Sequence, residues 1–168
     1  MRRVFLGIVL VLLLSAQSQP GAQPGAQPGF QDGLLAYHRG DHTVAMEIWR
    51  PLAERGDASA QYMVGYLYAQ GEGVVSNSGT AAKWYHRAAD QGDPDAQLNL
   101  GLLYVNGTGV KKSYATSYKW FALAYLTYPL GEYRENAFRN RENVASLMSA
   151  EQIETAQRLV RRWKPKTR

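Results

Sequence analysis

The strongest constraint on the fold is an internal repeat with a period of 36 residues. The segment AQYMVGYLYAQGEGV at residues 60–74 returns as AQLNLGLLYVNGTGV at residues 96–110, with eight of fifteen positions identical. The same offset of 36 residues relates Trp84 to Trp120 and Ala88 to Ala124. A fixed period of about 20–50 residues is typical of proteins built from stacked structural units. The sequence therefore predicts a repeat architecture.

Each unit is predicted to form two helices. Apolar residues recur at i, i+4, i+7 and i+8 between residues 60 and 68, and at helical spacing again between residues 81 and 89. This spacing places them on one face of a helix. Gly92 suits the end of the second helix, and Asp93 followed by Pro94 suits the start of the next one. The repeat period, the predicted helix end at Gly92 and the predicted helix start at Asp93 therefore all fit a unit of two helices.

The pattern AQxxxGxLYxxGxGV…AxxWYxxAAxxGDxxAQ resembles the Sel-1-like repeat, a relative of the tetratricopeptide repeat. The resemblance covers about residues 31–128, in units of about 31–56, 57–92 and 93–128. The first unit is degenerate, because it lacks the GxGV loop and turns at Gly40-Asp41 instead. The resemblance implies an all-α solenoid of antiparallel helix pairs.

The repeat pattern changes at the end of the third unit. Tyr128 and Pro129 stand where the second unit has Gly92 and Asp93. Residues 129–168 are therefore predicted to form C-terminal capping helices and a basic tail. The last helix is expected to begin at the capping box Ser149-x-x-Gln152.

The glycine pair of each unit is predicted to be a turn rather than a phosphate-binding loop. A dinucleotide fingerprint requires a strand before the glycines, a third glycine, and a helix directly after them. Here a helical pattern precedes the glycines, and the third glycine is absent. The glycines and the recurring aromatic residues are assigned to the scaffold: Gly65, Tyr68, Gly71, Gly73, Trp84, Gly92, Gly101, Tyr104, Gly107, Gly109 and Trp120.

The first 30 residues are predicted to lie outside the folded part. Residues 1–18 resemble a secretory signal peptide, with Arg2 and Arg3 before an apolar run from Val4 to Leu14. This run is shorter than the roughly 20 residues that a transmembrane helix needs. Residues 19–30 are rich in Pro, Gly and Gln and are interpreted as a flexible linker. A periplasmic or secreted location is expected, and an uncleaved signal could instead tether the domain to the membrane.

Catalytic and metal-binding patterns are weak in this sequence. The chain has no cysteine, which excludes disulfides and cysteine-ligated metals. His38 and His42 are four residues apart, but Gly40-Asp41 separates them, so they are expected to be exposed or capping residues rather than a metal pair. His86 is predicted to be a surface residue. No cofactor, no metal and no catalytic residue are therefore expected.

The positions that vary between the units are the candidates for binding a partner. In related solenoids the first helix of each pair lines the concave face. Aromatic and methionine side chains there suit protein or peptide binding. The candidate residues are Tyr62, Met63, Tyr66, Asn99 and Leu102. The alternative is that some of them pack against the C-terminal helices.

The sequence favours an exported, non-enzymatic scaffold or adaptor that binds a protein or peptide in the cell envelope. Its formal net charge is +5, and much of the excess lies in the last eleven residues. This basic tail is interpreted either as a solvated helix end or as a weak contact with anionic lipid headgroups, and nucleic acid is not an expected partner. The alternatives are a hydrolase acting on cell-wall or β-lactam-like substrates, suggested by some secreted relatives, and a membrane-tethered structural protein. The oligomeric state stays open.

Overall fold

The structure is a computed structural model that describes residues 28–166. Between these residues the chain forms eight helices and no strands. The helices are α1 (Phe30–His38), α2 (His42–Glu54), α3 (Ala58–Gln70), α4 (Ser78–Asp90), α5 (Pro94–Asn106), α6 (Tyr114–Thr127), α7 (Glu132–Ala145) and α8 (Ala150–Arg162). The predicted all-α fold is confirmed. The predicted signal peptide, and the predicted linker up to residue 27, lie outside the described residues.

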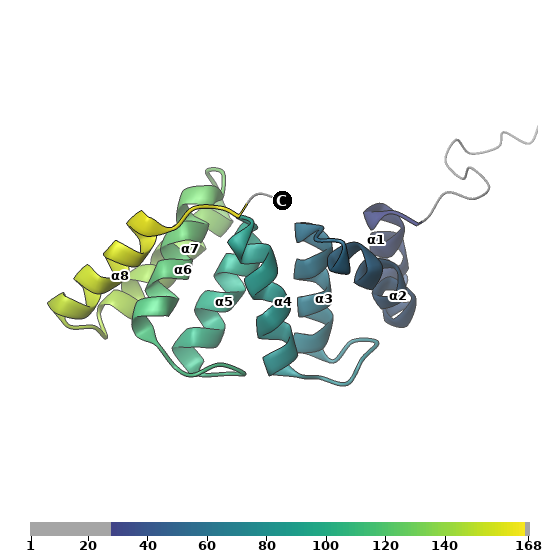
Figure 1. The fold of residues 1–168 in the computed structure, drawn as a ribbon, viewed down its shortest axis with the longest axis horizontal. Helices are drawn as coiled ribbons and strands as arrows, with labels where there is room; N and C mark the ends of the chain where they lie inside the picture. The colour runs from purple at the N-terminus through teal and green to yellow at the C-terminus, as the bar shows by residue number, and fades with distance from the viewer. Residues whose placement is uncertain (1–27, 167–168) are drawn as a thin grey trace, which may run out of the picture.

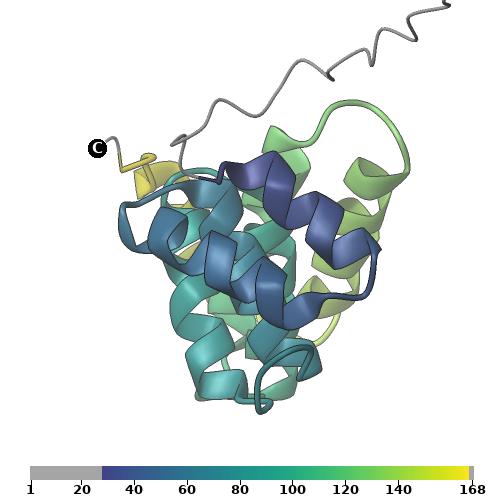
Figure 2. The same ribbon diagram turned by 90° about the vertical axis from the view of Figure 1, so that its right-hand side faces the viewer.

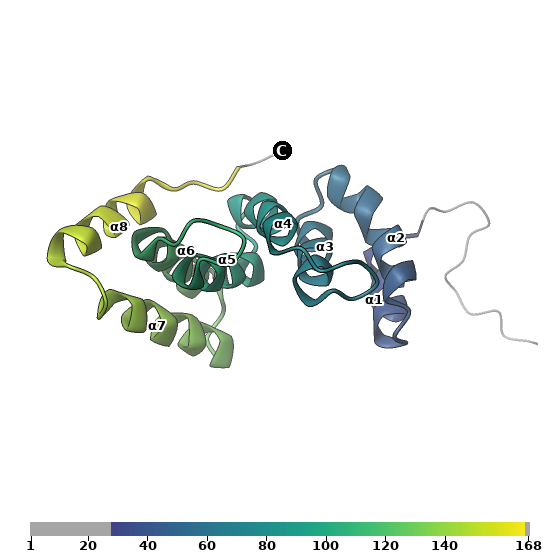
Figure 3. The ribbon, with the colours of Figure 1, turned by 90° about the horizontal axis from the view of Figure 1, so that it is seen from below.

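The helices form two rows along a curved array (Figure 1). Figure 3 shows α1, α3, α5 and α7 in one row and α2, α4, α6 and α8 in the other. Figure 2, which looks at the N-terminal end, shows α1 and α2 stacked in front of the following units. Each helix packs on the next one along the chain as far as α7, and α8 packs on α6. Within residues 28–166, no helix combines the length and the apolar character needed to cross a membrane.

Each helix pair is held together by a glycine that faces a large aromatic ring. A Cβ atom built on Gly65 would lie 2.7 Å from the ring of Tyr85, and one on Gly101 would lie 2.4 Å from the ring of Phe121. The degenerate first unit has the same contact, because a Cβ on Gly33 would lie 2.2 Å from the ring of Trp49. Only glycine lets the two helices approach this closely. The contact shows that α1 and α2 form a complete repeat pair despite their shorter sequence.

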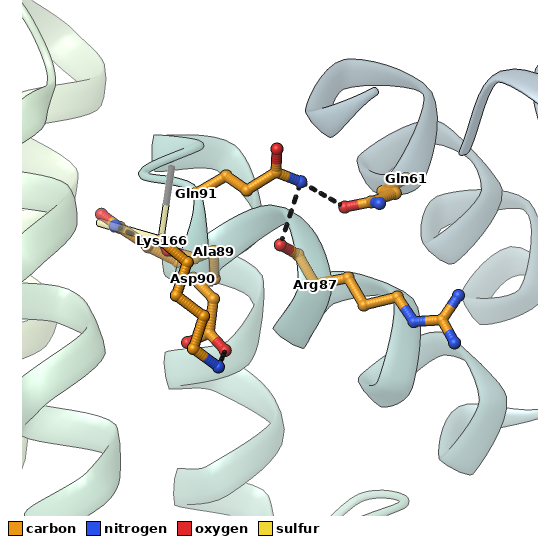
Figure 4. A network of polar contacts seen from close by, with 7 residues as sticks. Gln61, Arg87, Ala89, Asp90, Gln91 and Lys166 are labelled. Atoms are coloured by element: carbon orange, nitrogen blue, oxygen red, sulfur yellow. Dashed lines mark hydrogen bonds and ion pairs between the residues drawn. The ribbon is translucent and has the colours of Figure 1, made fainter. Parts of the chain in front are cut away.

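Neighbouring pairs are joined by a recurring polar contact. The Gln61 side chain donates a hydrogen bond to the Ala53 carbonyl at 3.0 Å, and Gln97 donates to the Ala89 carbonyl at 3.2 Å. Gln91 adds a bond to the Gln61 side-chain oxygen at 2.8 Å (Figure 4). Both Gln61 and Gln97 are buried. The glutamine of the repeated Ala-Gln pair therefore adds a second hydrogen bond to a carbonyl near the end of the preceding helix, which also accepts from the backbone amide of Gly56 or Gly92.

The two glycines of each loop have different surroundings. Gly107 ends α5 in the left-handed conformation, with a φ of 75°. Gly109 has a φ of 68°, and a Cβ atom on it would lie 2.4 Å from the backbone of Ser78 at the start of α4. Gly73 lies in the same way against the backbone of His42 at the start of α2. The first glycine turns the chain, and the second packs the loop on the preceding unit.

The helix starts that the sequence predicts are confirmed. Asp93 is the N-cap of α5 and accepts a hydrogen bond from the Ala96 amide at 2.8 Å, with Pro94 as the first residue of the helix. Ser149 begins α8, and its hydroxyl and the Gln152 side chain form the capping box.

The C-terminal tail returns to the repeat array after α8. Trp163 is half-buried and packs against the core formed between the second and third units. Lys166 donates through its amide to the Asp90 carbonyl and through Nζ to the Asp90 carboxylate, each at 2.7 Å (Figure 4). The interpretation of this tail as a solvated helix end is therefore wrong for Trp163, whereas residues 164–166 are exposed and Lys166 is held by its contacts with Asp90. Burial of apolar indole surface against this core favours docking of Trp163 over solvation.

Candidate functional site

The candidate residues lie on α3 and α5, in the row that also contains α1 and α7 (Figure 3). Tyr62 and Tyr66 are half-buried on α3, one helical turn apart. Leu102 on α5 occupies the position one period after Tyr66 and is 38% exposed. None of the three is fully buried, and the C-terminal helices α7 and α8 pack mainly on α6. These side chains are therefore partly accessible on the row of helices formed by α1, α3, α5 and α7, which we call the inner row.

The other two candidates are less available. Met63 is half-buried and packs against the core between the first and second units. Asn99 uses its side-chain amide to donate to the Asp95 carbonyl at 2.9 Å, within α5. These contacts leave Tyr62, Tyr66 and Leu102 as the members of the candidate set that can meet a partner with the least rearrangement.

Tyr62 and Tyr66 belong to a line of aromatic rings that joins four helices. Their ring centroids are 6.3 Å apart, and Tyr62 also stacks on Tyr85 of α4 at 5.8 Å. Tyr37 of α1 meets Tyr66 edge-on at 6.2 Å and stacks on His42 at 4.8 Å. Such offset and edge-on arrangements are favourable for aromatic rings. The line holds each tyrosine in one orientation, which lowers the entropy lost on binding a partner.

The surroundings of Tyr37 and Tyr62 disfavour loss of the phenol proton. Burial raises the pKa of Tyr37 above its ordinary value, and hydrogen bonds to Tyr66 and Glu72 raise it further. Burial also raises the pKa of Tyr62, with an added effect of the Asp95 and Asp93 carboxylates. The phenols therefore act as hydrogen-bonding groups and apolar surfaces rather than as acids or bases near neutral pH.

A second group of aromatic and acidic residues lies next to Tyr62, at the start of α5. The Tyr128 hydroxyl donates to the Asp95 carboxylate at 2.6 Å, and its ring stacks on Tyr133 at 5.8 Å. Tyr133 is the second residue of α7 and is 67% exposed. Together with Tyr62 and Tyr66, these residues extend the candidate surface from α1 to α7.

Sequence reasoning missed Tyr37, Tyr128 and Tyr133. Tyr37 lies in the shortened first unit, outside the 36-residue register, and the other two follow the point where the repeat ends. The period therefore carried no signal for them. A cluster of tyrosines brought together from four helices becomes visible only when the helices are stacked.

The prediction that His86 is a surface residue is wrong. His86 is half-buried on α4, with Nε2 at 2.9 Å from the Tyr104 hydroxyl. Its ring meets Trp120 edge-on at 5.7 Å. Tyr104 belongs to the next unit and covers His86. The equivalent pair 36 residues earlier is Arg50 of α2, which donates a hydrogen bond to the Tyr68 hydroxyl. Burial lowers the pKa of His86, which favours the neutral ring.

The other two histidines lie near α1 and the start of α2. His38 is exposed, and its ring lies edge-on to Tyr37 at 6.0 Å. His42 stacks on the Tyr37 ring at 4.8 Å and has Nδ1 at 3.8 Å from the Glu72 carboxylate. Among residues 28–166, no group of three or more His, Cys, Asp or Glu side chains is arranged to hold a metal ion.

Asp93 is expected to make the stability of the fold depend on pH between about 4 and 6. Burial raises the pKa of Asp93 from 3.8 to about 6, against the opposing effect of its bond from the Ala96 amide. The folded state therefore binds the proton more tightly than the unfolded chain, and stability falls as the pH rises through about 6. Asp93→Asn keeps a capping side chain without the buried charge. Urea unfolding is expected to show roughly 1–2 kcal/mol less pH dependence for this variant than for the parent.

The matched control for this measurement is Asp57→Asn. Asp57 caps α3 through the Ala60 amide at 2.8 Å, as Asp93 caps α5. If the two variants change the pH profile equally, or if Asp93→Asn leaves the profile unchanged, the buried carboxylate of Asp93 does not control the effect.

The stacked helix pairs, the glycine–aromatic contacts and the glutamine bridges define an α-solenoid repeat protein. The Sel1 repeat family model matches residues 58–93 and 94–126. The two matched segments begin and end within a few residues of the second and third structural units, so the chain contains two Sel1 repeats. Sel1 repeat proteins are generally protein-interaction scaffolds.

Two solved structures have the same fold. A protective antigen present in uropathogenic Escherichia coli strains, which displays an SLR fold, has 28% sequence identity and a TM-score of 0.73 over 80% of this chain. A Sel1 repeat protein from Oxalobacter formigenes has 28% identity and a TM-score of 0.58 over 79% of this chain. The chain spans only 28% of the first protein and 53% of the second. A comparison with curated proteins found no match.

Proposed function

We propose that this protein is a non-enzymatic scaffold of the cell envelope that binds a peptide segment of a partner protein on its inner row of helices. The observation that carries the proposal is the line of partly exposed tyrosines Tyr37, Tyr66 and Tyr62, with the exposed Tyr133 on the same row of helices. Tyrosine is enriched at protein interfaces because it offers a large apolar face and a hydrogen-bonding group. The rings are already held in place by their neighbours, so binding requires little ordering.

Export is part of this proposal, and its support comes from the sequence. Residues 1–18 have the basic tip and the apolar stretch of a signal peptide. Fractionation of cells that produce the full chain or a chain without residues 2–18 tests this part. Equal distribution of the two chains between cytoplasm and envelope contradicts export.

The binding surface is tested by site-specific photocrosslinking in the native host. A photoreactive amino acid at Leu102, which is 38% exposed on α5, is expected to capture a defined envelope protein. The same group at Lys83, exposed on α4 in the opposite row, is the matched control and is expected not to capture it. Capture from Lys83 alone, or from both positions equally, contradicts a partner site on the inner row.

Removing a side chain of the candidate surface is expected to weaken binding of the captured partner. Tyr66→Ala and Leu102→Ser are each expected to lower its affinity by about tenfold, because a few central residues contribute most of the binding free energy. Isothermal titration calorimetry measures the change, with thermal unfolding as the check that each variant is folded. Lys83→Ala is the control. Unchanged affinity in both inner-row variants contradicts the proposal.

A further inference from the structure

The C-terminal helices leave one face of α6 partly open. In the preceding units, each second helix is paired with the first helix of its own unit and covered by the next unit. Helices α7 and α8 depart from this arrangement, because both pack on α6 and they make little contact with each other. Figure 3 shows α7 and α8 on different sides of α6, in the two rows of the array. Along the side of α6 that lies between them, Leu126 is exposed and Tyr118 is half-buried, whereas Ala122 is only 5% exposed.

This side of α6 forms the floor of a cavity of about 180 Å³, which we call the end groove. Tyr118, Ala122 and Leu126 of α6 follow one another at a spacing of four residues, and Val160 of α8 lies beside them. Leu126 is 64% exposed, although it continues the apolar side of α6. A cavity of about 150 Å³ accommodates a benzene ring. The end groove therefore has room for one large apolar side chain.

The walls of the end groove are basic. Arg141 of α7 and Arg161 of α8 line it from opposite sides, and none of its lining residues is acidic. Arg141 pairs with its own neighbour Glu142 at 2.8 Å and lies over the Phe138 ring at 4.9 Å. Arg161 is exposed, and its side chain makes no hydrogen bond or ion pair with another residue of 28–166. An apolar floor between two guanidinium groups complements an apolar side chain that has carboxylates on either side.

We propose that the end groove binds a short amphipathic helix of a partner protein, with one leucine or phenylalanine in the cavity and glutamate or aspartate residues beside it. Residues 118, 122 and 126 line the floor of the groove at a spacing of four residues, which matches the i, i+4 spacing of the apolar side chains on a bound helix. This surface lies at the C-terminal end of the array, away from the tyrosines of α3. The protein therefore has two separate binding surfaces and can join two partners.

The first test uses a synthetic 16-residue helical peptide with a fluorescent label. The peptide carries Phe and Leu at positions i and i+4 and glutamates on the flanking positions. Fluorescence anisotropy with the purified residues 19–168 is expected to show saturable binding that weakens about tenfold or more between low and high salt. A peptide of the same sequence with lysine in place of every glutamate is expected not to bind. Equal binding of the two peptides overturns the proposed charge preference.

Variants of the chain locate the peptide. Arg161→Glu and Leu126→Glu are each expected to weaken binding by about tenfold or more, because each places a repelling carboxylate in the groove. Arg162→Glu, the same charge change one residue along α8 and outside the lining, is the matched control and is expected to change the affinity less than about twofold. Tyr66→Ala is expected to leave peptide affinity unchanged, so failure of the inner-row site and failure of this site are distinguishable.

Three outcomes overturn the proposal. The first is the absence of saturable peptide binding by a chain whose circular dichroism shows it to be folded. The second is an equal effect of Arg161→Glu and Arg162→Glu. The third is self-association of the protein, measured by sedimentation velocity, that Leu126→Glu abolishes, because a second copy of the chain would then occupy the groove.

Discussion

Replacing Gly109 with alanine is expected to destabilise the fold by about 3 kcal/mol or more. Gly109 has a φ of 68°, where an L side chain costs roughly 1–2 kcal/mol. In addition, the new Cβ atom would lie 2.4 Å from the carbonyl carbon and oxygen of Ser78, at the start of the preceding unit's second helix. Backbone cannot rotate away as a flexible side chain does, so the loop or α4 must move. Urea unfolding of the purified domain measures the loss.

The matched control is Gly107→Ala, two residues earlier in the same loop. Gly107 has a φ of 75°, but the nearest atom to an added Cβ is the Lys112 Cβ at 3.2 Å. The cost of this variant is expected to be about 1–2 kcal/mol, mainly from the backbone conformation. Equal losses in the two variants would show that the second glycine serves the turn alone and does not hold the loop against the preceding unit.

Truncating Trp120 to alanine is expected to cost about 3–5 kcal/mol, the range found for large aromatic residues in cores. Trp120 is 1% exposed and lies in the core between the second and third units. Its indole N–H has no hydrogen-bond partner among the described residues, so the loss comes from the cavity and from apolar contacts. The change could unfold a domain of ordinary stability. Circular dichroism during urea unfolding measures the free energy.

Trp163→Ala is the matched control, because it removes the same side chain from a less buried position. Trp163 packs on the same core but is half-buried and belongs to the tail after α8. Its loss is expected to cost about 1–2 kcal/mol, because less apolar area returns to water. If Trp163→Ala costs as much as Trp120→Ala, the tail is an integral part of the core. If both variants cost less than about 1 kcal/mol, the packing between these units does not limit stability.

The repeat period carried most of the fold prediction. Matching residues 36 positions apart predicted helix pairs, and the capping residues Asp93 and Ser149 predicted where two of the helices begin. These features are readable because helix periodicity and capping depend on residues a few positions apart. The close glycine–aromatic contact of the first unit was not readable, because Gly33 and Trp49 lie in a unit of different length.

The candidate site was predictable only in part. Tyr62 and Tyr66 were singled out as residues that vary between the units, and they lie together on α3. Tyr37 completes the same aromatic line but comes from the degenerate unit. His86 was misassigned because its cover, Tyr104, comes from the following unit. Each error concerns a contact between units, which a pattern within one unit does not contain.

The sequence by itself determined that this chain stacks helix pairs and which residues build them, because repetition, helix periodicity and helix caps are local and recur at a fixed offset. Only the tertiary structure decided which side chains remain available to partners. The helices α7 and α8 separate over α6 and open the end groove, and the tail returns to Asp90. The physical reason is that the exposure of a side chain depends on which residues from other units pack over it. Those residues are distant in the sequence, and a few of them at the boundaries between units decide what is covered.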